Sequence, residues 1–293
     1  MCIMTMMNWI VADLLMFACS VAVYVAIRKA ALDKLPHQFN NLAMFAIPAT
    51  VFVVGALATR QDMSLTLSQV LQVVFTGIVL SYLGSAMSMR SIELAPNAGY
   101  SLIISKSYVV LTSILAVPLF GAHLTIPAII AILLIVGFSA LIMINPKATH
   151  HAKSSAWVPL AIGTFFCWAF LQIMAKHFNN QGVSAIVFLA YFFTIAAACI
   201  VVEMLHRNIR FELVRRHARP FVTIGIASSG FNFFNFYAVS IAPNVGFVNA
   251  TNAASIGAFT MLSVVLFKDE LTKRKFFGVI GVMLGLILLF LVK

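Results

Sequence analysis

The sequence has 293 residues and a formal net charge of +11; 62% of its residues are hydrophobic and only 9% are charged. Soluble domains carry about 25% charged residues, so a soluble core cannot take up this apolar surplus. The basic residues lie in short gaps between apolar runs, which is typical of loops that face anionic lipid headgroups rather than nucleic acid. The composition predicts an all-α polytopic protein of the lipid bilayer and argues against a large soluble catalytic domain.

Ten apolar runs predict ten transmembrane helices, because each span needs roughly 20 apolar residues. We expect the spans at 9–28, 40–59, 69–91, 97–119, 126–145, 157–177, 184–206, 219–241, 244–266 and 276–292. The first run leads into charged residues without a small-residue cleavage site, so we interpret it as a span rather than a signal peptide.

Several motifs of soluble and intramembrane enzymes are missing from the sequence. It contains no phosphate-binding glycine loop followed by Lys-Ser/Thr, no paired intramembrane carboxylates and no His-Glu-x-x-His motif. The four cysteines are scattered without metal or disulfide spacing. We therefore expect no enzyme activity, no metal and no cofactor.

The chain repeats a motif at the start of two of its helices. Ala95-Pro96-Asn97-Ala98-Gly99 recurs 147 residues later as Ala242-Pro243-Asn244-Val245-Gly246, and Leu124-Thr125 recurs as Leu271-Thr272 at the same offset. These matches predict that residues 1–146 and 147–293 are two five-helix repeats of a single transmembrane domain. Because five is odd, the halves enter the membrane in opposite directions, which gives an inverted repeat with a solute site near mid-membrane.

These residues carry a resemblance to a known family. Each half has an Ala-Pro-Asn-x-Gly junction, a polar helix, a short loop that ends in Leu-Thr and a last helix with glycine; the second half reads Lys268-Asp269-Glu270-Leu271-Thr272 before Gly278. This pattern resembles the EamA branch of the drug/metabolite transporter superfamily over essentially the whole chain. In the first half, residues 121–125 lack the usual acid. The resemblance implies a ten-helix carrier, often an exporter of amino acids or other metabolites.

The basic residues are unevenly divided between the two sides of the membrane. The connections after the odd-numbered spans hold 15 lysines and arginines, whereas the other side, termini included, holds 3. The positive-inside rule then places both termini outside the cytoplasm, most simply in a bacterial inner membrane. The family resemblance implies the opposite, with termini inside; we follow the charge count.

Three ionisable residues lie within predicted spans: Lys106, Asp13 and Glu203. Such side chains cost about 2.5–3.5 kcal/mol at a helix centre. Lys106 is furthest from water, so we expect it to bind solute, with a structural pairing, for instance with Asp13, as the alternative. Asp13 is a candidate carrier of a coupling proton or else a packing residue. Glu203, near Arg207 on the same helix, is best explained as an interfacial anchor.

Polar residues at equivalent repeat positions predict the rest of the solute site. Ser101, Ser105, Tyr108 and Thr112 form one helical stripe, and Asn249, Asn252 and Ser255 occupy the equivalent second-half helix. Aromatic and amide side chains on other spans suit a polar organic solute. The predicted substrate-binding residues are Lys106, Ser105, Tyr108, Ser101, Asn249, Asn252, Asn232, Asn235, Trp168, Gln172 and Tyr82. The alternative is interhelical hydrogen bonding without a ligand.

The small-xxx-small pair Gly281 and Gly285 predicts close helix packing, either within the chain or in a homodimer. Together the patterns favour a secondary active or facilitative transporter that moves a small anionic or zwitterionic metabolite, such as an amino acid or nucleotide-like compound, by alternating access. A membrane-embedded enzyme on lipid-linked substrates is the first alternative, although the seven histidines are spread over separate loops. A non-transporting receptor or assembly subunit is the second.

Overall fold

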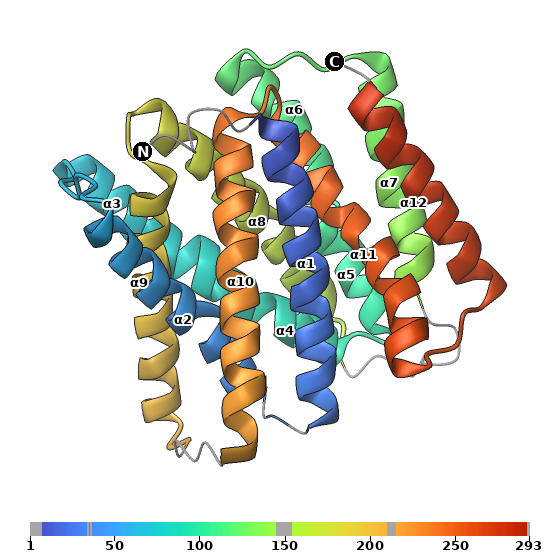
Figure 1. Cartoon of the computed structure of the whole chain (residues 1–293), viewed down its shortest axis with the longest axis horizontal. Helices are drawn as coiled ribbons and strands as arrows, with labels where there is room; N and C mark the ends of the chain where they lie inside the picture. The colour runs from blue at the N-terminus through green and yellow to red at the C-terminus, as the bar shows by residue number, and fades with distance from the viewer. Residues whose placement is uncertain (1–7, 34, 36, 145–153, 210–214, 292–293) are drawn as a thin grey trace. The chain divides into compact units, whose positions relative to one another are not determined.

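The computed structural model describes residues 8–33, 35, 37–144, 154–209 and 215–291, and this part of the chain is helical without strands. The helices form ten spans, and the third and fourth spans are interrupted (Figure 1). They are α1 (Trp9–Leu32), α2 (His37–Ala58), α3 (Leu67–Phe75) with η2 (Thr76–Leu83) and α4 (Gly84–Leu94), α5 (Ala98–Lys106) with α6 (Tyr108–Phe120), α7 (Ile126–Met143), α8 (Trp157–Asn180), α9 (Ala185–His206), α10 (Arg215–Ile241), α11 (Val245–Phe267) and α12 (Lys273–Leu291).

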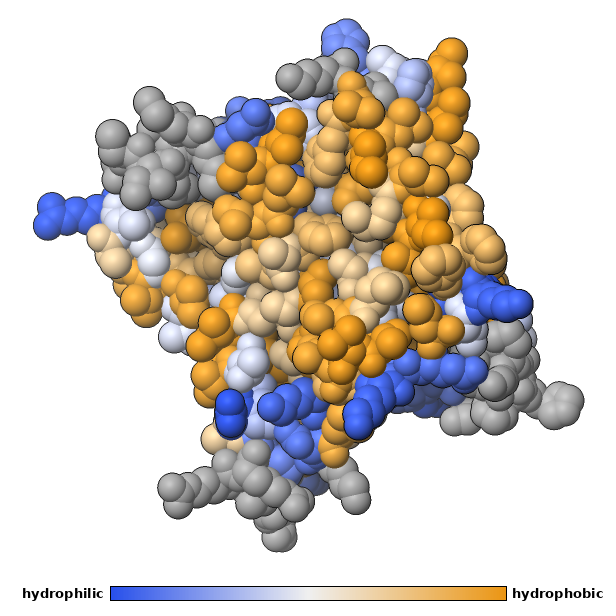
Figure 2. All heavy atoms as spheres, turned by 45° about the vertical axis from the view of Figure 1, so that its right-hand side comes forward, coloured by the Kyte–Doolittle hydropathy of each residue, from blue (hydrophilic) through white to orange (hydrophobic). Residues whose placement is uncertain are grey.

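The structure confirms the predicted helical membrane fold. Nine of the spans in the described residues are long and apolar enough to cross a bilayer. The predicted span at 219–241 lies within α10, whose serines and asparagines lower its mean hydropathy. On the face drawn in Figure 2, hydrophobic residues cover the middle and hydrophilic residues gather toward the edges. This distribution suits helices whose outer side chains meet lipid.

The predicted helix ends were wrong by up to four residues. The first helix continues to Leu32, so Arg28 and Lys29 lie in its last turns rather than after it. Likewise, α8 continues to Asn180 rather than ending at residue 177, and Lys176 lies within the helix. Basic residues are tolerated there because their long stems reach toward water or toward helix-end carbonyls. Residues 145–153, which cover the end of the fifth predicted span and part of the following connection, lie outside the described residues.

Two interruptions in the first half were not predicted. The third span contains the eight-residue π-helical segment η2, and the fourth is broken at Ser107 between α5 and α6. Within η2, a Cβ on Gly77 would lie 2.7 Å from Ile195 Cγ2 and 3.1 Å from the Phe192 carbonyl oxygen. The wider π turn thus accompanies an approach of η2 to the backbone of α9. Such segments occur frequently at functional sites.

The helices group into two compact units. One comprises Met1–Tyr82 with Met174–Ser240, and the other comprises Leu83–Ile173 with Ile241–Lys293. Each unit therefore combines segments from both sequence halves.

Within the second unit, α7 and α12 lie side by side (Figure 1). Gly278 of α12 faces Ile142 of α7, while Gly285 faces Ile135, so the two helices run antiparallel. A Cβ on Gly281 would lie 2.1 Å from the Phe138 ring. The glycines of α12 therefore serve packing within the chain. Gly281 and Gly285 are buried against α7, which favours the packing alternative within the chain, and a homodimer stays an untested prediction.

The two Ala-Pro-Asn-x-Gly junctions begin helices in the same way. Asn97 accepts a hydrogen bond from the Gly99 amide at 2.9 Å, and Asn244 accepts one from the Gly246 amide at 2.8 Å. Asparagine is a favoured N-cap because its side chain satisfies an amide that lacks a helical partner. A Cβ on Gly246 would clash with Ser113, so glycine here allows α11 to pack closely on α6.

The helix bounds follow the 147-residue offset that the sequence motif predicts. Shifting α7 by 147 gives 273–290, against Lys273–Leu291 for α12, and shifting α2 gives 184–205, against Ala185–His206 for α9. The equivalent pairs α7/α12 and α2/α9 each pack together, and in the second pair Gly55 meets Ile186 while Phe45 meets Phe193, which is again antiparallel. Opposed directions of equivalent helices are what an inverted repeat requires. The inverted repeat itself stays a prediction that these observations favour.

Candidate functional site

Lys106 lies at the interruption of the fourth span. It is the last residue of α5, and one residue, Ser107, separates it from α6. Its ammonium nitrogen is 5.0 Å from the centroid of the Trp168 ring of α8. Both neighbours favour a cation, because an aromatic face attracts positive charge and the C-terminal end of a helix carries partial negative charge. The break thus places a cation within the span, beside an aromatic wall.

Tyr108 continues this wall on the other side of the break. Its side chain is 3% exposed, and its ring meets Trp168 edge-on with centroids 6.1 Å apart. Its hydroxyl makes a long contact of 3.5 Å to the Asn249 side-chain oxygen, and the Asn249 amide donates to the Thr112 hydroxyl at 3.0 Å. A chain of polar groups therefore joins α6 to α11 and fixes the orientation of the Asn249 amide.

The polar stripe of the fourth span faces the protein interior, as predicted. The exposed fractions of its four members are at most 3%, and they are Ser101, Ser105, Tyr108 and Thr112. Ser101 forms a short hydroxyl pair with Ser91 of α4, while Ser105 donates to the Leu102 carbonyl at 3.2 Å. In α11, Ser255 is at the position equivalent to Tyr108 and donates to the Asn252 carbonyl at 2.6 Å. Each of these serine hydroxyls has a partner within the protein, and contact of Ser101 and Ser105 with a solute stays a prediction.

The sequence and the structure were compared with those of known proteins. Residues 155–291 match the model of the EamA-like transporter family. This segment, which lies in the second half of the chain, is therefore similar to the EamA-like transporter family. A solved structure titled only "Crystal structure of protein" is similar over 96% of this chain and 95% of its own, with a TM-score of 0.79 and 16% sequence identity, and it supports the fold alone. No curated protein matches the chain. The match of this segment supports a membrane transporter of small solutes.

The remaining predicted site residues fall in both units. Gln172 and Asn252 belong to the unit that contains Lys106, and both are buried. Asn232 and Asn235 of α10 and Asp13 of α1 belong to the other unit. Asp13 and Asn235 are 0% and 1% exposed, and the Asn232 amide donates to the Ser228 carbonyl at 2.8 Å. Their contact with a solute stays a prediction.

Tyr82 has a partner that the sequence did not reveal. Its hydroxyl donates to a carboxylate oxygen of Glu203 at 3.0 Å, and the other Glu203 oxygen pairs with Arg207 at 2.9 Å. The Glu203–Arg207 spacing of four residues is visible in sequence and supports the anchor interpretation of Glu203. The Tyr82 contact was missed because it joins residues 121 positions apart and depends on the approach of η2 to α9.

Two basic side chains outside the predicted solute site bind carbonyls at helix ends. Lys176 donates to the Ser240 carbonyl at 3.1 Å, one residue before α10 ends, and Arg274 donates to the Leu141 carbonyl at 3.0 Å near the end of α7. The last carbonyls of a helix have no helical partner, so a cation there is favourable. Among the described residues, no three His, Cys, Asp or Glu side chains gather into a metal-binding group.

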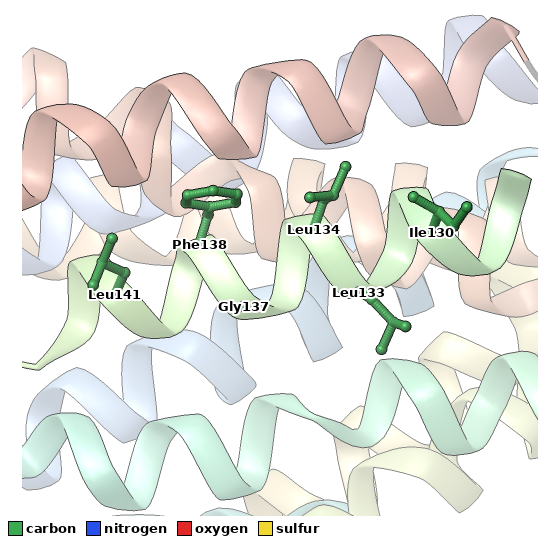
Figure 3. Close-up of a pocket in the computed structure, with 6 residues that line it drawn as sticks. All are labelled: Ile130, Leu133, Leu134, Gly137, Phe138 and Leu141. Carbon is green, nitrogen blue, oxygen red and sulfur yellow. The ribbon is translucent and has the colours of Figure 1, made fainter.

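Two grooves differ in their chemistry. One lies along α7 and is lined by Ile130, Leu133, Leu134, Gly137, Phe138 and Leu141; in Figure 3, Phe138 and Leu134 point toward α12 and Leu133 points away from it. The other lies along α9 and is lined by Tyr82, Ile195, Ala198, Cys199, Val202, Glu203, His206 and Arg207. No polar side chain lines the α7 groove, whereas four polar side chains lie at one end of the α9 groove: Tyr82, Glu203, His206 and Arg207.

Proposed function

We propose that the chain is a secondary active or facilitative carrier of a small anionic or zwitterionic metabolite, with an amino acid or a nucleotide-like compound as the solute class. Lys106 binds the carboxylate or phosphate of the solute, and Trp168, Tyr108 and Asn249 form the neighbouring wall. The carrier works by alternating access. The single observation that supports this assignment is the Lys106 ammonium at a helix break, 5.0 Å from the centre of the Trp168 ring.

The magnitudes indicate how much a solute anion would contribute to the stability of the Lys106 cation. A cation at the centre of a span costs about 2.5–3.5 kcal/mol. A cation–π contact returns about 0.5–2 kcal/mol, so Trp168 alone does not offset that cost. A solute anion would add to the contacts of Lys106, and the alternative source of an anion is Asp13. A charge-assisted hydrogen bond to a solute anion contributes about 1.5–3 kcal/mol, which is comparable with the cost of the cation.

The experiment begins with purified protein, whose thermal stability is screened against a metabolite library, followed by flux measurements in proteoliposomes with each stabilising solute. Lys106→Ala is expected to abolish flux while the protein stays inserted and folded. The matched control is Lys176→Ala, which removes a lysine that also lies within a helix but binds the Ser240 carbonyl. That variant is expected to keep its solute selectivity.

The double variant Asp13→Asn/Lys106→Ala separates the two sources of the anion. If Lys106 only pairs with Asp13, each single variant loses stability and the double variant recovers both stability and transport. Recovered transport in the double variant would overturn the solute-binding role of Lys106. A persistent loss of transport in a stable double variant supports it.

For the location, we propose a bacterial inner membrane with both termini outside the cytoplasm. The support is the division of 15 basic residues against 3 between the two sides. Arg207 and Arg274, which lie at helix ends in the structure, belong to the more basic side. Sidedness follows Lys and Arg in short loops because they resist translocation.

A further inference from the structure

The groove along α9 combines an apolar wall with a charged end. Ile195, Ala198 and Val202 lie on successive turns of one face of the helix, and Glu203 and Arg207 follow at its end. With a rise of 1.5 Å per residue, Ile195 and Glu203 are about 12 Å apart along the axis. The groove has a volume of about 580 Å³. Its polarity, apolar within the span and charged near the helix end, matches that of a phospholipid.

The charged end offers both a carboxylate and a guanidinium. Glu203 accepts from Tyr82 at 3.0 Å and from Arg207 at 2.9 Å, and these two contacts hold its carboxylate in place. The Arg207 side chain is 65% exposed and the Glu203 side chain 31% exposed, so an incoming group can reach both. A guanidinium carries five N–H donors, which leaves Arg207 with donors beyond the one that contacts Glu203.

We propose that this groove binds a phospholipid whose headgroup joins a phosphate to a primary ammonium, as in phosphatidylethanolamine. The phosphate accepts hydrogen bonds from Arg207, and the ammonium donates to Glu203. An acyl chain covers Ile195, Ala198 and Val202. The exposed fraction of Val202 is 64%, so the apolar wall is open to lipid.

The same residues argue against other common headgroups. A quaternary choline has no N–H to donate and is bound instead by cages of Trp, Tyr or Phe, whereas Tyr82 is the one residue of these three types among those that line the groove. A purely anionic headgroup would meet the Glu203 carboxylate. The arginines from Arg207 to Arg219 attract anionic lipids to this side of the protein, but this attraction does not depend on binding in the groove.

Bound lipid would also lie against η2. Tyr82 belongs to that segment, and Gly77 of η2 packs on Ile195 of the groove wall. An ethanolamine lipid is therefore expected to stabilise the approach of η2 to α9, and its binding should appear as a higher unfolding temperature of the full chain.

The test measures lipid binding to the purified full-length protein by native mass spectrometry and thermal unfolding, using dioleoyl phosphatidylethanolamine, its N-methyl and N,N-dimethyl derivatives, phosphatidylcholine and phosphatidylglycerol. Affinity is expected to fall as N–H donors are replaced by methyl groups. Phosphatidylethanolamine should bind at least about tenfold more tightly than phosphatidylcholine, the factor that corresponds to about 1.4 kcal/mol. Equal binding of the two, or tighter binding of phosphatidylglycerol, would overturn the proposal.

Glu203→Gln should remove the preference for phosphatidylethanolamine over phosphatidylcholine. Glu93→Gln is the matched control, because Glu93 also pairs with an arginine, Arg90 at 2.9 Å, but lies outside the groove. Val202→Trp, at an exposed position, fills the groove without removing a charge, and it should weaken binding of every lipid there. A preference that survives both Glu203→Gln and Val202→Trp contradicts the assignment of this groove.

Discussion

The Lys106 ammonium lies 5.0 Å from the centroid of the Trp168 ring, and the same ring meets Tyr108 edge-on at 6.1 Å. One indole thus contacts residues on both sides of the break at Ser107. Its negative face attracts the cation, and it is packed edge-on against the phenol ring. Trp168 therefore holds the two short helices α5 and α6 in one arrangement around the charge.

The effect of replacing Trp168 on solute affinity should depend on whether the new side chain has an aromatic ring. Trp168→Leu removes the aromatic face and is expected to weaken binding of the anionic solute by about 0.5–2 kcal/mol, because the Lys106 ammonium loses its orienting contact. Trp168→Phe retains a weaker aromatic face and should lose less. Titration of the solute identified in the stability screen measures both effects.

Phe166→Leu provides the control for these variants. Phe166 lies on the same helix, but it is 46% exposed and stacks on Phe170. We expect unchanged solute affinity. If Trp168→Leu binds as tightly as the unmodified protein, the indole has no part in positioning Lys106.

The packing of α12 on α7 predicts opposite effects of two glycine replacements. Gly281→Ala places a methyl group 2.1 Å from the Phe138 ring and is expected to destabilise the protein by about 1–3 kcal/mol, the usual range for overpacking. Gly137→Ala meets nothing within 4 Å and should be neutral or stabilising by up to about 1 kcal/mol, because alanine favours helix. Thermal unfolding in detergent compares the two. Equal loss of stability would contradict this packing.

The spans were predictable from sequence because each is a continuous apolar run bounded by charge or by an Ala-Pro-Asn-x-Gly junction. The helix ends were less predictable than the spans, because nothing in the sequence marks Leu32 rather than Arg28 as the end of α1. A helix can leave the bilayer without losing its hydrogen bonds, so the hydrophobic boundary and the helical boundary need not coincide.

The interruptions and the cross-chain contacts were not predictable in this way. The segment Thr76–Leu83 contains no proline, and its π geometry accompanies the contact between Gly77 and α9. Lys106 was predicted as the main ionisable candidate, but its position at a helix end and its contact with Trp168 depend on tertiary packing. The same holds for the bond from Tyr82 to Glu203, whose partners lie 121 residues apart.

The antiparallel direction of α7 and α12 can be tested by cysteine crosslinking. After the four native cysteines are replaced by alanine, Ile142→Cys with Gly278→Cys should form a disulfide, since a Cβ at 278 would lie 2.6 Å from Ile142 Cγ1. Ile142→Cys with Gly285→Cys should not, because Gly285 faces Ile135, two turns earlier on α7. Disulfides require Cβ atoms about 3.5–4.5 Å apart, so the two pairs discriminate sharply. Crosslinking of only the second pair would reverse the helix direction and remove support for the inverted repeat.

The charge asymmetry predicts the side of the membrane on which the chain ends. A fluorescent protein that matures only in the cytoplasm, fused after Lys293, should stay dark, while a reporter that is active only outside the cytoplasm should work. The reason is that 15 lysines and arginines lie on the side opposite the termini and 3 on the termini side, and short basic loops are retained in the cytoplasm. A second pair of fusions at Gln61, in the connection between α2 and α3, should report the same side as Lys293, because an even number of spans separates the two points. Fluorescence from a cytoplasmic reporter at both positions would place the termini inside, as the family resemblance implies, and the charge rule would then fail for this chain.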